Sequence, residues 1–177
     1  TKNISYKKSI QWNHTSVEEV TAGLIKRNVD YWVTVSNESQ KQLKNKFNTD
    51  SIVIRNEIAD VKELMKEKVE LKKAKLNLVT ISRIAVEKGF TRMFKIVKEL
   101  KNNNIDFIWY FVGDARTKDY SKQIRDIFKD FPEVIFVGNK LNPYPYLKNA
   151  DYGVILSDRE SDCLFVRECR KINIPVI

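Results

Sequence analysis

The sequence is poor in cysteine and histidine. It contains two cysteines, Cys163 and Cys169, and one histidine, His14, among 177 residues. Two cysteines are too few for a disulfide-stabilised scaffold, and six residues apart on a helix they would point to different faces, so a bridge between them is not expected. We therefore expect a reduced, cytoplasmic setting, with each cysteine either packed in the fold or without a role. A single histidine excludes metal sites built from several histidines and proton relays built from two.

Long apolar runs are also absent. No window approaches about 18 uninterrupted apolar residues, which a membrane-spanning helix would need. Residues 1–9 lack an initiator Met and the apolar core of a signal peptide. We therefore expect a section of a longer protein, truncated at both ends. With 42% hydrophobic residues, the chain can form one sizeable core, or one complete domain plus part of another.

Positive charge is in excess but is not concentrated. The chain carries 32 basic and 23 acidic residues, net +9, of which 15 and 10 lie in residues 1–75 and 17 and 13 in residues 76–177. An even mixture is unlike a stripe that follows phosphates, so no nucleic-acid partner is expected. Two interpretations stay open: a solvated basic surface, or a weak peripheral attraction to an anionic leaflet at the inner membrane face or to polyanionic substrates.

From residue 76 onward, strand and helix patterns alternate. Short apolar runs predict strands, and apolar residues at helical spacing predict helices. The predicted strands are Leu76–Ile81, Phe107–Val112, Val134–Val137, Tyr152–Leu156 and one opening at Pro175; the predicted helices contain Phe90–Leu100, Tyr120–Phe128 and Leu164–Lys171. This order is typical of an α/β fold with a Rossmann-like, doubly wound parallel sheet.

The first 58 residues show a shorter form of the same pattern. Strands are predicted at Ile10–Asn13, Tyr31–Val35 and Ser51–Arg55, with a helix capped by Ser36 and ending at Phe47. We expect residues 1–58 to be the tail of an N-terminal Rossmann-like domain and residues 59–177 to be a second such domain, incomplete at its C-terminus. The Lys/Glu-rich segment Val61–Lys75 predicts a connecting helix.

Ligands of doubly wound sheets bind at the carboxyl ends of the strands. Those ends are predicted at Ser82-Arg83, Gly113-Asp114, Gly138-Asn139 and residues 157–162. At the first of them, Arg83 and Lys88 are two cations five residues apart across a strand-to-helix turn that Gly89 would ease. Both could face a diphosphate, although each could equally be an ordinary surface charge.

Two carboxylates, Glu160 and Glu168, flank the start of the last predicted helix. If Ser161 or Asp162 caps this helix, the free N–H groups of its first turn form an anion site beside Glu160. Glu168 would lie about two turns in, where a carboxylate could accept both hydroxyls of a ribose. An ordinary amphipathic surface helix would explain the same residues. The preceding segment 142–152, with two prolines, predicts a turn that leads into a strand.

Taken together, these motifs resemble the C-terminal, nucleotide-sugar-binding domain of the retaining family 4 glycosyltransferases, which have the GT-B fold. The order is Ser-Arg, Glu-Lys-Gly, Val-Gly-Asp, Phe-x-Gly, Ala-Asp, Ser, two Glu separated by seven residues, and Pro-Val-Ile. In this chain they are Ser82-Arg83, Glu87-Lys88-Gly89, Val112-Gly113-Asp114, Phe136-Val137-Gly138, Ala150-Asp151, Ser157, Glu160 with Glu168, and Pro175-Val176-Ile177. Asp30 through Ser36 and Asn56 before Ile58 resemble the crossover region of the same family.

The resemblance implies a role for each matching residue. Arg83 and Lys88 would bind the donor diphosphate and act in catalysis with Glu160, which would hold the hydroxyls of the donor sugar. Glu168 would hold the ribose, and backbone near Gly113 and residues 139–141 would contact the base. The donor site would be completed by the start of the last helix, at Ser161, Asp162, Cys163 and Leu164. His14 is an acceptor-side candidate, with a structural role as the alternative.

We therefore expect a glycosyltransferase that moves a sugar from a nucleotide-sugar donor to an acceptor with retention of configuration. The acceptor would be a carbohydrate or lipid-linked intermediate of polysaccharide synthesis. The sequence lacks Asp-x-Asp, so no metal and no cofactor are expected, and Arg83 and Lys88 would supply the positive charge. This section alone is expected to bind nucleotide with little turnover. The alternatives are a GT-B nucleotide-sugar epimerase, or a binding module with a decayed site, which Ser161 and Arg167 would favour because the family has other residues there.

Overall fold

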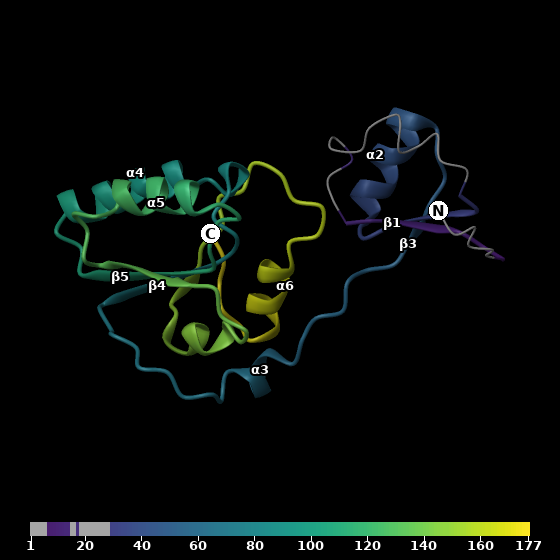
Figure 1. Cartoon of the computed structure of the whole chain (residues 1–177). Coiled ribbons are helices and arrows are strands. Elements are labelled where there is room, and N and C mark those ends of the chain that lie inside the picture. The colour runs from purple at the N-terminus through teal and green to yellow at the C-terminus, as the bar shows by residue number, and fades with distance from the viewer. Residues whose placement is uncertain (1–6, 15–16, 18–28) are drawn as a thin grey trace. The chain divides into compact units, whose positions relative to one another are not determined.

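The computed structural model describes residues 7–14, 17 and 29–177, and these residues form two compact units (Figure 1). The first unit contains the described residues up to Glu57 together with Arg159–Cys163. The second contains Ile58–Asp158 and Leu164–Ile177. In the described part of the chain, no helix combines the length and the apolar character that crossing a bilayer requires.

The first unit is built on a three-stranded parallel sheet. Its strands are β1 (Ile10–Asn13), β2 (Tyr31–Thr34) and β3 (Ile52–Val53), in the order β1-β2-β3. Helix α2 (Asn37–Phe47) begins after Ser36, whose hydroxyl accepts a hydrogen bond from Ser39 N. Leu43 of this helix packs with Trp32 and Val17 in a small core. The predicted cap at Ser36 is therefore confirmed.

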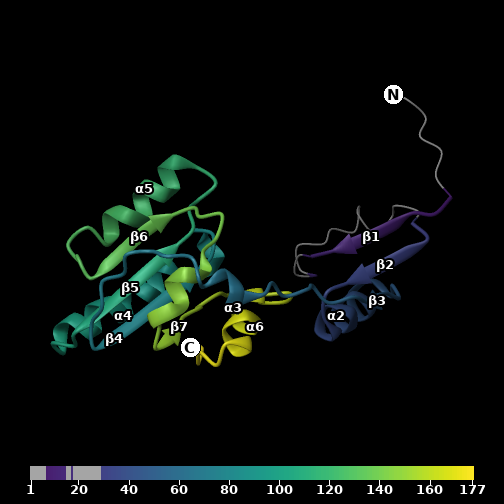
Figure 2. The same cartoon turned by 90° about the horizontal axis from the view of Figure 1, so that it is seen from below.

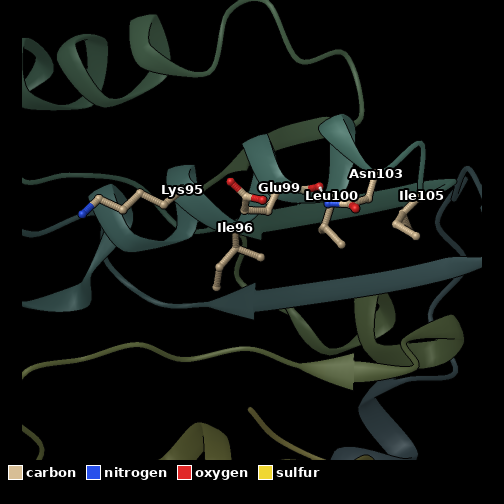
Figure 3. A pocket seen from close by; sticks show the side chains of 6 residues that line it. All are labelled: Lys95, Ile96, Glu99, Leu100, Asn103 and Ile105. Atoms are coloured by element: carbon tan, nitrogen blue, oxygen red, sulfur yellow. Dashed lines mark hydrogen bonds between the residues drawn. The ribbon is translucent and has the colours of Figure 1, made fainter.

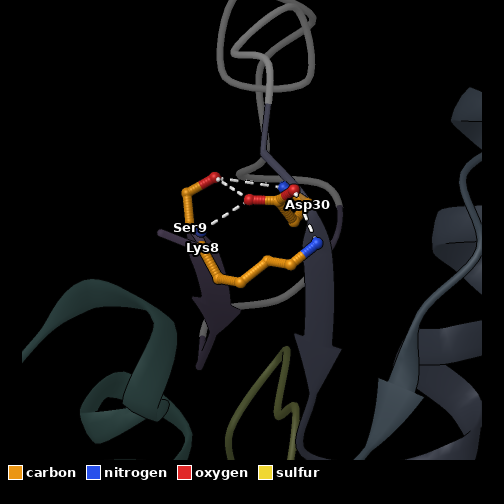
Figure 4. A network of polar contacts seen from close by, with 3 residues as sticks. All are labelled: Lys8, Ser9 and Asp30. Carbon is orange, nitrogen blue, oxygen red and sulfur yellow. Dashed lines mark hydrogen bonds and ion pairs between the residues drawn. The ribbon is translucent and has the colours of Figure 1, made fainter. Parts of the chain in front are cut away.

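A polar network joins the segments that lead into β1 and β2. Asp30 Oδ2 accepts hydrogen bonds from Ser9 N at 2.7 Å and from Ser9 Oγ at 3.0 Å, and Lys8 Nζ lies 3.5 Å from Oδ1 (Figure 4). The backbone N–H of Asp30 donates to Ser9 Oγ in return. The hydrogen bond from the Ser9 backbone is the main reason that the pKa of Asp30 lies below its usual value.

The second unit contains a four-stranded parallel sheet. Its strands are β4 (Leu76–Ile81), β5 (Phe107–Val112), β6 (Val134–Gly138) and β7 (Tyr152–Gly153), in the order β6-β5-β4-β7 (Figure 2). A parallel bridge between Gly153 and Val176 continues the sheet beyond β7. Strand order therefore runs outward from β4 in both directions, which is the arrangement of a doubly wound sheet. The expected α/β, Rossmann-like fold class is confirmed.

Helices cover both faces of this sheet. Helices α4 (Phe90–Asn102) and α5 (Lys118–Ile127) lie on one face, and the 3-10 helix η3 (Tyr144–Asn149) and α6 (Leu164–Lys171) lie on the other (Figure 1). All six residues of β5 are buried, as expected for a strand covered on both sides. Trp109 and Phe111 pack under α4 and α5, and Tyr110 faces the ring of Tyr146 in η3.

Three sequence predictions need correction. The connecting helix predicted for Val61–Lys75 is only α3 (Val61–Leu64). Beyond it, backbone N–H groups bond to side chains of the sheet instead of to a helix: Lys72 N donates to Tyr110 Oη at 2.7 Å, and Ala74 N donates to Asn77 Oδ1 at 3.1 Å. The strands predicted at Ser51–Arg55 and Tyr152–Leu156 are shorter, namely Ile52–Val53 and Tyr152–Gly153, because only these residues pair in register with a neighbour.

Candidate functional site

The candidate site of the second unit lies where its strand order reverses. Strands β4 and β7 are neighbours, but β5 and β6 lie on one side of β4 and β7 lies on the other. At such a point the connections leave the sheet in opposite directions, so a crevice opens at the carboxyl ends of the two strands. The segments that follow these ends are Ser82–Gly89 after β4 and residues 154–158 after β7.

These two segments are held together by backbone contacts. Asp158 N donates to Glu87 O at 2.8 Å. Gly89 has a φ of +73°, and a Cβ there would overlap the carbonyl oxygen of Leu156. The close approach therefore requires glycine at position 89, which gives a physical reason for the Glu-Lys-Gly motif.

Arg92, in the first turn of α4, strengthens this junction. Its guanidinium donates to the carbonyl oxygen of Leu156 and lies 2.7 Å from Asp158 Oδ1. A planar guanidinium that binds a carbonyl and a carboxylate of the same turn restricts that turn to one conformation. Arg92 was not predicted from the sequence, since nothing in its local pattern distinguishes it from other basic residues of an exposed helix face.

The end of β5 approaches the end of β4 just as closely. Gly113 has a φ of +131°, and a Cβ there would overlap the carbonyl oxygen of Ser82. Ser82 N donates to Val112 O at 3.1 Å, and Ile84 N donates to Asp114 O at 3.1 Å. The loop after β4 is therefore held from the β5 side at Ser82 and Ile84, and from the β7 side at Glu87 and Gly89.

Arg83 and Lys88 both lie in the segment held in this way. The Arg83 side chain is 51% exposed, and its Nη2 lies 3.4 Å from Glu87 Oε1. A pair so long and so exposed contributes little free energy, so an incoming anion could displace it at small cost. Lys88 is half-buried at the end of the 3-10 helix η2 (Val86–Lys88). The two cations thus share one rigid loop at the strand-order reversal.

Asp114, which follows Gly113, is engaged with its own turn. Its carboxylate accepts hydrogen bonds from the Ser121 hydroxyl, from Ala115 N at 2.8 Å and from Arg125 Nη2 at 3.3 Å. The Ser121 hydrogen bond is the largest cause of a pKa below the usual value for this carboxyl. Asp114 therefore fixes the connection from β5 to α5.

Glu168 lies in the second turn of α6, on its inner side. Its side chain is 8% exposed, and Oε1 accepts a hydrogen bond from the Tyr144 hydroxyl at 2.8 Å. Burial, together with this hydrogen bond and the charge of Glu168, raises the pKa of Tyr144 to about 12. Glu168 was predicted from the sequence as a site residue, whereas Tyr144 was predicted only as part of a turn.

The start of α6 differs from the expected cap. The helix begins at Leu164, so Ser161 and Asp162 both lie outside the cap position, which falls to Cys163. Their side chains bond elsewhere in the first unit: Ser161 Oγ donates to His14 O at 2.6 Å, and Asn56 Nδ2 donates to Asp162 Oδ2 at 3.1 Å. The expected cap by Ser161 or Asp162 is therefore wrong, because the helix begins two or three residues after them.

The predicted site residues are thus divided between the two units. Arg83, Lys88, Gly113, Leu164 and Glu168 belong to the second unit, and His14, Glu160, Ser161, Asp162 and Cys163 belong to the first. The exposed His14 side chain stacks on Trp12, with ring centroids 5.3 Å apart. The expected meeting of Glu160 with the two cations stays a prediction. Among the described residues, no cluster of three or more histidine, cysteine or acidic side chains is arranged to hold a metal ion.

A hollow lies on the second unit toward the amino ends of the strands. Side chains of α4 and of the turn before β5 line it: Lys95, Ile96, Glu99, Leu100, Asn103 and Ile105 (Figure 3). Helix α4 starts beside the candidate site and runs antiparallel to the strands, so these residues lie toward the amino ends of the strands. Residues that lead into parallel strands do not form the ligand crevice of this fold.

The fold is that of GT-B glycosyltransferases. The lipopolysaccharide outer core galactosyltransferase WaaB matches 94% of the chain with a TM-score of 0.66 and 17% identity. TarM of S. aureus, solved with UDP, matches 98% with a TM-score of 0.74 and 16% identity. HepE of Anabaena, solved with UDP, matches 94% with a TM-score of 0.71 and 17% identity.

The chain spans 48%, 37% and 52% of the lengths of these three proteins, about half or less. Identities this low show the fold, and activity does not follow from fold alone. No protein-family model matches the chain, and a comparison with curated proteins gave no match.

Proposed function

We propose that the chain carries the donor-binding half of a glycosyltransferase that moves a sugar from a nucleoside diphosphate sugar to an acceptor hydroxyl. The observation that carries this proposal is the loop after β4. Backbone contacts from β5 and from the segment after β7 hold it rigid, and it presents Arg83 and Lys88 at the strand-order reversal. The solved structures of TarM and HepE, which share the fold, contain UDP.

The chemistry of the transfer explains why two fixed cations would matter. When the bond between sugar and diphosphate breaks, negative charge grows on the leaving phosphate. Cations already in position stabilise that charge in the transition state without rearranging during the reaction. In this proposal Arg83 and Lys88 act on the diphosphate, and N–H groups at the start of α6, from Cys163 and Leu164, add donors for the anion.

The remaining roles follow the family resemblance. Glu168 would accept the ribose hydroxyls, and the backbone at Gly113 would border the base. Glu160 would hold the sugar hydroxyls, with Ser161 and Asp162 bordering the same segment, and His14 would serve the acceptor. We further propose family 4 membership and transfer of a hexose with retention of configuration and without a metal. The acceptor would be a carbohydrate or lipid-linked precursor of a polysaccharide, met by a cytoplasmic enzyme in peripheral contact with the membrane.

Calorimetric titration of the chain with UDP, GDP and ADP tests the donor site. Arg83→Ala or Lys88→Ala should each weaken binding of the preferred diphosphate by roughly tenfold to a hundredfold, as expected for loss of one charge-assisted hydrogen bond. Binding of the corresponding nucleoside, which lacks phosphate, should change little. The matched control is Lys75→Ala, because Lys75 is an exposed cation just before the other end of β4.

Failure of all three diphosphates to bind would overturn the proposal and favour a decayed binding module. With the full-length protein, product analysis with and without acceptor extracts separates two activities. A transferase forms a glycosylated product only when acceptor is added, whereas an epimerase or hydrolase converts the donor without it. Unchanged turnover in the presence of EDTA is the expected result for metal-independent transfer.

A further inference from the structure

Glu168 is a buried carboxylate whose hydrogen-bond partner is a tyrosine. Its side chain is 8% exposed, and the Tyr144 hydroxyl lies 2.8 Å from Oε1. In the described part of the chain no ion pair joins Glu168 to a cation. Burying a carboxylate without a cation lowers the stability of the fold. The presence of Glu168 at a buried position of α6 is therefore better explained by a role in binding than by a contribution to stability.

Tyr144 is itself held in place by the segment around it. It stands between Pro143 and Pro145, whose rings restrict the backbone on both sides. Tyr144 N donates to Asn142 Oδ1 at 3.3 Å, and Asn142 Nδ2 donates to Leu64 O at 2.8 Å. The hydroxyl of Tyr144 therefore reaches Glu168 from a braced backbone.

The hydrogen bond leaves Glu168 with unused acceptor capacity. A tyrosine hydroxyl has one proton to donate, whereas a carboxylate has about four acceptor sites. Since the pKa of Tyr144 is raised to about 12, the hydroxyl keeps its proton at neutral pH and acts as the donor. Occupying one site on Oε1 fixes the rotation of the carboxylate and leaves other sites for a ligand that brings two neighbouring O–H donors.

We propose that Tyr144 is a positioning residue: by fixing the carboxylate of Glu168, it orients both oxygens toward a ribose diol and makes the site select ribonucleoside over deoxyribonucleoside diphosphates. This inference rests on the proposed function, because it takes Glu168 to be the group that meets the nucleotide ribose. It adds a residue from a separate segment, 24 positions away in the chain, to the donor site.

The test compares UDP, GDP and ADP with their 2′-deoxy and 3′-deoxy forms in calorimetric titrations of the chain. The wild-type chain should bind the preferred ribonucleotide about tenfold to a hundredfold more tightly than either deoxy form, which corresponds to one hydrogen bond to a charged group. In Tyr144→Phe this preference should fall to about twofold or less. Binding of each deoxy form should weaken less than binding of the ribonucleotide, because a deoxy form keeps only one of the two hydroxyls that Glu168 would accept.

Two further variants separate positioning from simple loss of structure. Tyr146→Phe removes a hydroxyl from the same 3-10 helix, where the ring contacts Tyr110 and not Glu168, and it should keep the full preference for ribose. Glu168→Gln should lose the preference, and adding Tyr144→Phe to it should cause no further loss. Thermal unfolding of each variant shows whether the second unit is folded at the titration temperature.

The outcomes distinguish the inference from the function on which it rests. If Tyr144→Phe weakens ribo and deoxy forms equally, or leaves the preference intact, the positioning role is wrong while the nucleotide site stands. If the wild-type chain binds none of the diphosphates, the proposed function and the inference are both overturned.

Discussion

Each of the two sheets of this chain consists of parallel strands, but the two sheets are stabilised in different ways. In the second unit all six residues of β5 are buried, and the Phe111 ring lies 5.0 to 5.4 Å from the rings of Phe90, Phe128 and Phe136. In the first unit β1 has one buried residue of four, Asn13, while Ile10 is 63% exposed. The polar Ser9–Asp30 network joins its first two strands.

The sheet of the second unit is stabilised mainly by its buried aromatic core, whereas the sheet of the first unit depends in part on polar contacts. Aromatic side chains bury large apolar areas and gain further from edge-to-face geometry, so they supply most of the stability of a core. Hydrogen bonds between exposed groups contribute much less because water competes for them. The loop that carries Arg83 and Lys88 thus stands on the sheet with the larger apolar core, which suits a site that depends on fixed charges.

The largest expected change in stability comes from replacing a tryptophan, and the two sheets can be compared by doing so in each unit. Trp109 is fully buried at the centre of β5, and its Nε1 donates to Thr80 Oγ1 at 3.1 Å. Trp109→Ala should lower the free energy of unfolding of the second unit by about 3–5 kcal/mol, as for other large core truncations. Trp12→Ala, at a site that is 44% exposed, should change the stability of the first unit far less. Denaturant unfolding followed by circular dichroism measures both.

Equal losses in the two variants would contradict the contrast drawn between the sheets. Trp109→Phe is the conservative replacement at the buried site, and it should recover much of the stability because the aromatic volume is mostly kept. It would still lose the hydrogen bond to Thr80, whose hydroxyl donates onward to Val154 O at 2.7 Å. A remaining deficit of about 1 kcal/mol is therefore expected.

Elements with a clear apolar pattern could be predicted from the sequence in both units, and strand Ile10–Asn13 of the first unit has its predicted bounds. In the second unit, the two strands Leu76–Ile81 and Phe107–Val112 have their predicted bounds because each is a short apolar run. Helix Leu164–Lys171 also has its predicted bounds. The segment Val61–Lys75 was predicted wrongly, since its charged residues suggested a helix while its backbone bonds to Tyr110 and Asn77 of the sheet. Charge pattern carries no information on such distant partners.

Contacts between candidate residues that lie far apart in the chain could not be read from local patterns. Tyr144 meets Glu168 across 24 residues, and Ser161 meets His14 across 147. Motif order identified Glu168, Ser161 and His14 as candidates, but side-chain pairs between distant segments arise only from the folded arrangement. For the same reason Tyr144 and Arg92 were missed, although both lie within or next to predicted motifs.

The second test concerns two glycines at the carboxyl ends of strands in the second sheet. Gly113→Ala would place a methyl group on the carbonyl oxygen of Ser82 at a φ of +131°, which other residues rarely adopt. We expect a loss of about 3 kcal/mol, together with loss of diphosphate binding as Ser82 and Arg83 shift. Gly138→Ala is the matched control, because its φ is +78° but no atom lies within 4 Å of the added Cβ. It should cost only about 1–2 kcal/mol of backbone strain and keep diphosphate binding.

The smallest expected effect belongs to the polar network of the first sheet. Because the folded-state pKa of Asp30 lies below the usual 3.8, its carboxylate stabilises the first unit above about that pH, and this contribution disappears as the pH falls through the lower folded value. Asp30→Asn should therefore speed hydrogen exchange at the β1–β2 amides at neutral pH, with the difference from wild type shrinking in acid. Asp50→Asn removes a highly exposed carboxylate paired with Lys44 at 2.9 Å and should leave those amides unchanged. Equal effects of the two variants would mean that the network is no more than surface charge, and that the small apolar core around Leu43 holds the first sheet alone.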